Sequence, residues 1–147
     1  MTDARLAFLG TATDQRAIGS GFVVKKSVTS STVIQAGVNL TNLSTGGDLE
    51  IVDVHVDTDG TGFAGGTNVE LRATNANGIL LKWAFTVASM GANKSLNLKD
   101  GLTVGEPFIL ESGKRLTLDA TVADCTGAGV AVFNIVCRRL ADGATLT

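Results

Sequence analysis

Several residue types that serve recognition and catalysis are scarce in this chain of 147 residues, which has no tyrosine, one proline, one histidine and two cysteines. The lack of tyrosine argues against a recognition surface of amphipathic aromatic side chains, as in antibodies and lectins. His55 would have to serve any Ser-His-Asp device, yet no serine elbow of the G-x-S-x-G kind occurs. We therefore expect a protein that is not an enzyme and binds no cofactor.

An excess of basic residues and a long apolar run are also missing. The 12 lysines and arginines against 14 acids give a net charge of -2, which argues against direct contact with nucleic acid. No apolar run approaches the roughly 20 residues of a membrane helix, and the N-terminus lacks the features of a secretory signal. With 44% hydrophobic and 18% charged residues, the chain should fold by itself in the cytoplasm where it is made.

The two cysteines, Cys125 and Cys137, flank a predicted turn over 126–129. A hairpin centred on this turn would place Cys125 opposite Val130 and Cys137 opposite the region of Leu118. Two such positions are too far apart for a disulfide, which requires Cα atoms within about 7 Å. We expect two buried free thiols, in keeping with a reducing compartment.

Alternation of apolar and polar residues with period two is the main pattern along the chain, and it predicts half-buried β-strands. Between the strands over 68–74 and 79–88, Asn77 and Gly78 favour a tight hairpin turn. In the second of these strands the residues from Ile79 to Val87 at every second position form one apolar face. Nine strands are predicted: Phe22–Thr29, Thr32–Leu40, Leu49–Asp57, Asn68–Thr74, Ile79–Ala88, Leu96–Leu98, Phe108–Leu110, Leu116–Val122 and Val130–Arg139.

Many short strands, 18 glycines and no convincing amphipathic helix predict an all-β protein with two packed antiparallel sheets. The strand over 130–139 is apolar on both faces, so we expect it at the centre of a sheet covered on both sides. The long intervals 41–48 and 58–67 fit strands that cross between sheets. The predicted fold is therefore an antiparallel β-sandwich of the jelly-roll kind.

The first 20 residues differ from the rest because their apolar residues follow no clear period. We expect residues 1–20 to form an extended N-terminal arm whose apolar side chains need a surface supplied by a neighbour, and residues 21–147 to form a single β-sandwich domain. The arm residues predicted to bind a partner are Arg5, Leu6, Phe8, Leu9, Arg16 and Ile18.

Two polar groups offer alternatives that involve a metal ion. His55 lies between Asp53 and Asp57 on one strand face, which could be half a metal site, but a solvated polar face explains the pattern without an ion. The segment from Asp57 to Gly62 matches part of an EF-hand loop, yet Asn68 stands where that loop requires glutamate. We expect no metal at either place and leave calcium open for the second.

Two further groups have a structural and a binding interpretation. Trp83 could stack on a sugar or a base, but its register with neighbouring apolar residues favours core packing. The predicted core between the sheets consists of Trp83, Phe85, Leu116, Leu118, Phe133 and Ile135. Arg138 and Arg139 should lie on opposite faces of the last strand, where one could reach a partner's carboxylate or both could be solvated.

Three consecutive features of the C-terminal half form a recognisable pattern. They are the stretch from Asp100 to Leu118, which contains Glu111-Ser112-Gly113, the glycine turn after it, and the apolar run from Val130 to Val136. In this part the chain resembles the decoration or cement proteins of tailed-bacteriophage capsids. The resemblance covers about a third of the chain. It implies a sandwich closed by two strands and carries over no catalytic residue.

The resemblance implies a non-enzymatic virion protein that binds the outer surface of a phage capsid and stabilises the shell by bridging its subunits. Its partners would be the major capsid protein and sister copies in a homo-oligomer on the lattice, without nucleic acid or membrane. It would be made in the cytoplasm of the bacterial host and reside on the capsid surface. The alternative is a carbohydrate-binding sandwich module of a phage host-attachment apparatus, with Trp83 exposed and calcium in the Asp57 loop.

Overall fold

The computed structural model describes residues 17–74, 78, 80–97 and 108–147, and in this part the chain is all-β. The larger sheet has the strand order β1 (Gly21–Thr29), β11 (Val130–Arg139), β3 (Leu49–Thr58) and β7 (Ser95–Asn97). A fifth strand, β8 (Phe108–Leu110), pairs with the beginning of β3, whereas β7 pairs with its end. All of these pairs are antiparallel.

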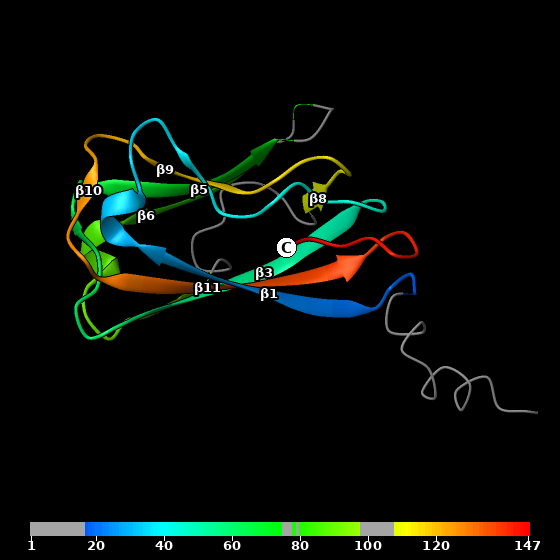
Figure 1. Cartoon of the computed structure of the whole chain (residues 1–147), viewed down its shortest axis with the longest axis horizontal. Coiled ribbons are helices and arrows are strands. Elements are labelled where there is room, and N and C mark those ends of the chain that lie inside the picture. The colour runs from blue at the N-terminus through cyan, green and yellow to red at the C-terminus, as the bar shows by residue number, and fades with distance from the viewer. Residues whose placement is uncertain (1–16, 75–77, 79, 98–107) are drawn as a thin grey trace, which may run out of the picture.

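The second sheet has the order β2 (Val38–Asn39), β9 (Thr117–Ala120), β5 (Asn68–Thr74) and β6 (Leu80–Thr86). A two-stranded ribbon of β4 (Ala64–Gly65) and β10 (Cys125–Thr126) lies at one end of the molecule (Figure 1). Two 3-10 turns, η2 (Ser30–Thr32) and η3 (Val87–Met90), complete the described elements. None of the helical turns within these ranges is long and apolar enough to cross a membrane.

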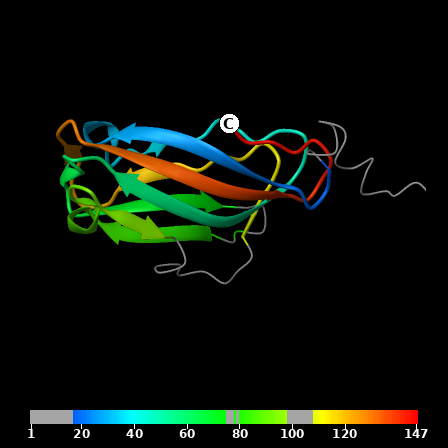
Figure 2. The same cartoon turned by 90° about the horizontal axis from the view of Figure 1, so that it is seen from below.

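The connections confirm the sandwich prediction. The chain passes from β2 in one sheet to β3 in the other across 40–48, and back to β5 across 59–67. If β4, β8 and β10 are set aside, the eight remaining strands form two four-stranded sheets with the strand order of a jelly roll, which contains two Greek keys. Figure 2 shows the two sheets as separate layers.

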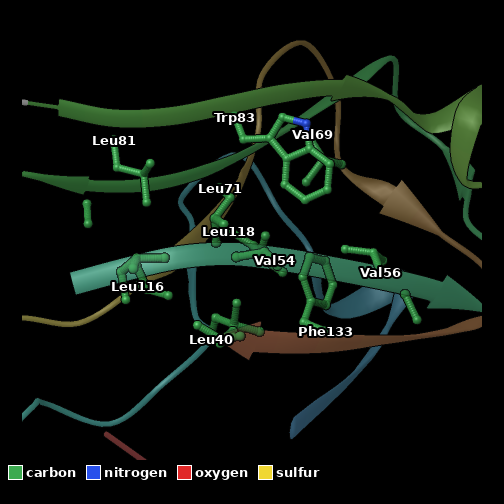
Figure 3. Packing of buried hydrophobic residues seen from close by; sticks show 14 of the residues in the cluster. Leu40, Val54, Val56, Val69, Leu71, Leu81, Trp83, Leu116, Leu118 and Phe133 are labelled. Atoms are coloured by element: carbon green, nitrogen blue, oxygen red, sulfur yellow. The ribbon is translucent and has the colours of Figure 1, made fainter. Parts of the chain in front are cut away.

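The core fills the space between these layers, where alternate residues of both sheets meet (Figure 3). Phe133 of β11 is fully buried, and Trp83 of β6 faces it from the other sheet with 3% of its surface exposed. The predicted core is confirmed for all six residues, which are at most 8% exposed. The alternating apolar face of β6 is likewise confirmed for Leu81, Trp83 and Phe85. The predicted strand continued to Ala88, but β6 ends at Thr86 and the buried Val87 begins η3, while Ile79 lies outside the described residues.

The predicted strand Thr32–Leu40 is mostly wrong. Its first residue ends η2, and only Val38 and Asn39 pair with β9. Gly37 adopts a positive φ of 81°, and a Cβ at this position would lie 2.5 Å from Oδ1 of Asp119. The segment therefore turns at Gly37. Val33 and Leu40 are buried from loop positions, and their apolar side chains produced the pattern that suggested an extended strand.

The pairing across the turn at 126–129 also differs from the prediction. β9 pairs with β2 and β5, whereas β11 pairs with β1 and β3, so the two strands lie in different sheets and form no hairpin. Cys125 faces Gly65, and Cys137 lies between Phe22 and Ile51. Both thiols are nevertheless free and buried, as expected, and burial raises the pKa of Cys137 to about 12.

The last strand occupies the centre of its sheet, as predicted, but only one of its faces is fully covered. Alternate residues from Ala131 to Arg139 are buried, whereas Val130, Val132 and Val136 on the other face are only half-buried. The prediction of cover on both sides is wrong for the described residues. The outer face of the five-stranded sheet therefore retains apolar side chains near the surface of the single chain.

Candidate partner-binding surface

The six residues predicted to bind a partner lie in the predicted N-terminal arm, and the structure describes one of them. Arg5, Leu6, Phe8, Leu9 and Arg16 fall outside the described residues. Ile18 is 66% exposed, which is the largest value among the exposed large hydrophobic side chains of the described part. Its side chain is therefore free to be buried by another molecule, and the arm's role stays a prediction.

The root of the arm, residues 17–20, is attached to the end of β11 by hydrogen bonds. The amide of Gly19 donates to the carbonyl of Arg139 at 2.8 Å, and the amide of Arg139 donates to the carbonyl of Ser20 at 2.9 Å. The amide of Ile18 donates to Oδ1 of Asp142 at 3.0 Å. These bonds fix residues 18–20 against the end of β11.

Arg139 is the side chain that organises this end of the molecule. It is 7% exposed, its Nε donates to the carbonyl of Ala144 at 2.8 Å, and its Nη1 donates to Oγ of Ser20 at 3.0 Å. The guanidinium also lies 4.2 Å from the ring centroid of Phe22. A buried charge requires such partners, so Arg139 joins the arm root, β1 and the C-terminal segment into one unit.

Arg138 projects from the opposite face of β11, which confirms that the two arginines lie on different faces. Its Nη2 forms an ion pair with Oε2 of Glu50 in the same chain. A β-bulge shifts the register of β3 and β11 between Val136 and Cys137. Glu50 consequently pairs with Arg138 and Asp53 with Val136, and both of these β11 residues point outward. The sequence left open that one of the two arginines binds a carboxylate of another protein. The carboxylate that Arg138 reaches in the structure is that of Glu50 in its own chain.

The group around His55 forms a polar row on the outer face of β3. Oδ1 of Asp53 accepts a hydrogen bond from the backbone amide of Val54, and Oδ2 lies 3.3 Å from Nε2 of His55. Nδ1 of His55 lies 3.1 Å from the side-chain amide nitrogen of Asn97. Asp57 is further along the strand and accepts a hydrogen bond from Ser95. Within the described residues no group of three or more His, Cys, Asp or Glu side chains could hold a metal.

The loop after β3 uses its second aspartate as a turn residue. Oδ1 of Asp59 accepts the amides of Thr61 and Gly62, and Oδ2 accepts the amide of Val130. These hydrogen bonds, those of Gly62 and Thr61 foremost, hold the pKa of Asp59 below its ordinary value. Asp57 and Asp59 thus serve different local bonds, as expected for a turn stabilised by side-chain to backbone hydrogen bonds.

The outer faces of the two sheets differ in chemistry. On the four-stranded sheet Glu70 lies 2.7 Å from Nζ of Lys82, and Arg72 lies 3.1 Å from Oδ2 of Asp119. On the five-stranded sheet Val23 of β1 is 59% exposed and lies opposite the half-buried Val136. Both faces carry their own charge pairs, but the second also has apolar side chains on β1 and β11 that a partner could cover.

The carbohydrate-binding alternative required an exposed tryptophan. Trp83 is buried and packs against Phe85 with ring centroids 5.0 Å apart. The expectation attached to that alternative is wrong, because Trp83 belongs to the core and offers no stacking platform. No other observation on the described residues favours sugar binding.

Comparison with known proteins adds information about the fold. No protein-family description and no curated protein sequence matches the chain. A chain from the acidic stable capsid structure of the Helicobacter pylori bacteriophage KHP30 is similar in structure, with a TM-score of 0.52 and 15% sequence identity. The likeness covers 88% of this chain and 95% of that chain. At this identity the two chains share a fold, and the likeness extends over nearly all of both.

Proposed function

We propose that this chain is a non-enzymatic structural protein of a phage virion, which binds the outer surface of the capsid and bridges its subunits. The observation that carries the proposal is the structural likeness to a capsid chain over nearly the whole length of both proteins. Sequence resemblance to capsid decoration proteins in the C-terminal half supports the same class. The partners would be the major capsid protein and sister copies.

The described surface is suited to such a role. Ile18 is exposed, and Arg139 attaches the nearby Ser20 to the sandwich, so a contact made at Ile18 would be held by a rigid domain. The lattice of a shell presents many copies, and modest contacts at each copy then hold collectively. The protein would be synthesised in the cytoplasm of the bacterial host and would reside in the virion.

Capsids of the source phage made without this protein provide the test. Purified protein should bind them at a fixed stoichiometry and raise the temperature at which they break open. Binding without saturation, or no binding, would contradict the proposal.

A pair of matched variants locates the contact. Ile18 and Val122 are exposed to 66% and 61%. Ile18 lies beside the residues that follow β11, whereas Val122 lies between β9 and β10, and Figure 1 shows β10 at the opposite end of the sandwich from the end of β11. Ile18→Asp should weaken attachment by about 10- to 100-fold, because burying an isoleucine stabilises a contact by about 1.5 to 3 kcal/mol. Val122→Asp should bind as the unmodified protein does. Equal binding by both variants would exclude the end of the sandwich that holds the arm root.

A further inference from the structure

The first strand of the larger sheet has an open edge. β1 pairs with β11 on one side, and no other strand of the described residues pairs with it (Figure 1). The amide of Ser30 donates to Gly129, and the amide of Arg139 donates to Ser20. Because hydrogen-bonded pairs alternate along an antiparallel ladder, the even residues of β1 bond β11, and the odd residues from 21 to 29 direct their backbone groups outward.

The outward groups of Val23, Lys25 and Ser27 receive no backbone hydrogen bond from any described residue, and all three side chains are exposed. Such an edge is a template for an additional strand. Apolar side chains flank it on both sides of the sheet. Val23 lies on the outer face, while Phe22 and Val28 are only partly buried at the rim of the core. A strand added here would meet apolar groups on both of its faces.

One segment of this chain has the corresponding pattern. Leu6, Ala7, Phe8 and Leu9 are apolar at consecutive positions, so a strand formed from them would present Leu6 and Phe8 on one face and Ala7 and Leu9 on the other. This explains why the arm shows no clean period, because a strand covered on both faces needs none. We propose that residues 6–9 of one copy add as a strand to the open edge of β1 in a second copy.

The geometry of the root favours a second copy over the same chain. Ile18 is bonded to Asp142 and Gly19 to Arg139, on the side of β1 that faces β11. The root is therefore held on the far side of β1 from the open edge. Seven residues, 10–16, separate the segment 6–9 from the root, and at about 3.3 Å per extended residue they span about 23 Å, enough to reach a domain that lies alongside.

Pairing of two β1 strands with each other is less suitable. An antiparallel pair centred on the middle of Gly21–Thr29 would place Lys25 directly opposite Lys25 of the other copy. Like charges in that arrangement destabilise a sheet, and edge lysines are a common protection against such pairing. The arm has two acids and two bases, Asp3, Asp14, Arg5 and Arg16, and so brings no net charge to the edge.

The inference rests on the proposed function only in that a shell brings copies close together, and its test uses purified full chains without capsids. Lys25→Pro removes one outward amide and should block the edge, because proline is tolerated where the amide faces solvent. Ala84→Pro is the matched control on β6, an edge strand of the other sheet, where Ala84 is exposed and its amide points away from β5. Phe8→Asp disables the arm, with Thr11→Asp as its control.

Sedimentation analysis should show association of the full chain and of both controls. Protein concentrations up to about 1 mM are used, because this is the effective concentration that short tethers provide between neighbouring copies. Lys25→Pro and Phe8→Asp should each remain monomeric. Their equimolar mixture should associate one to one, because the first retains an arm and the second retains an edge. Thermal unfolding of each variant establishes that it is folded.

Amide hydrogen exchange of the unmodified chain tests the same contact without any substitution. On association, the amides of Val23, Lys25 and Ser27 should become protected, whereas those of Phe22, Val24 and Lys26 should be protected at all concentrations. Protection of the odd amides that does not depend on concentration would mean that the arm binds its own domain. That result, a failure of the two variants to complement each other, or a chain that stays monomeric would each overturn the proposal.

Discussion

Phe133→Ala should be among the most damaging single substitutions in this protein. Phe133 lies in the middle of β11, is fully buried, and faces the other sheet in the centre of the core. Its removal forfeits about 1.5 to 3 kcal/mol of burial free energy and leaves a cavity that adds about 24 cal/mol per Å³. The expected loss in the free energy of unfolding is about 3 to 5 kcal/mol.

Val132→Ala is the appropriate control because Val132 precedes Phe133 on the same strand but faces the half-covered side. It should cost about 1 kcal/mol or less. Urea unfolding followed by tryptophan fluorescence measures both, since Trp83 lies in the same core, and Phe133→Ala should also lower the Tm by roughly 10 to 15 °C. A loss below about 1 kcal/mol for Phe133→Ala, or equal losses for the two variants, would refute this account of the core.

Three further outcomes follow from the described contacts. Arg139→Ala should lower the free energy of unfolding by about 2 to 3 kcal/mol in urea titrations, since the carbonyl of Ala144 and Oγ of Ser20 each lose a charged donor. Gly129→Ala should prevent folding or lower the Tm by more than 10 °C or so, because its Cβ would lie 1.6 Å from the carbonyl of Gly62, while Gly60→Ala, with open space around it, should leave the Tm nearly unchanged. The hydrogen bonds to the Asp59 carboxylate lower its pKa and so stabilise the fold above the ordinary value of 3.8, and this contribution is lost as the pH falls through the lower folded pKa. The difference in urea midpoint between the protein and Asp59→Asn should therefore be largest at about pH 6 and decrease as the pH falls below 3.8.

Period-two alternation was sufficient to find the strands that have one buried face. Phe108–Leu110, Asn68–Thr74 and Val130–Arg139 were predicted with the bounds that the structure shows, and the β5–β6 hairpin pairs in the predicted antiparallel order. In Asn68–Thr74 neighbouring side chains point to opposite faces, and burial of one face dictates the alternation, whereas Val130–Arg139 was predicted as a strand with apolar residues on both faces. The sandwich follows because several such faces must be buried against one another.

Pairing partners and loop burial could not be predicted in the same way. β11 pairs with β1, which is distant in sequence, and nothing in either strand specifies the other. Val33 and Leu40 are apolar and buried from turns, so their pattern resembles a strand. The role of Arg139 was also missed, because the sequence of two adjacent arginines does not indicate which of them is buried. Lys25 and Lys26 were a sequence signal that β1 lies at the edge of a sheet, because lysines are common on edge strands. The apolar residues of the same strand obscured this signal.

The position of β11 has a consequence for the time course of folding. Ser20 and Arg139 are bonded to each other although 119 residues separate them, and β11 lies between β1 and β3, which precede it in the chain. During synthesis neither of these strands has its main neighbour until β11 leaves the ribosome. Contacts at such separation make folding slow, on a scale of roughly milliseconds to seconds. Until then the apolar faces of β1 and β3 need protection from aggregation, and a chain that stops before β11 should not yield the five-stranded sheet.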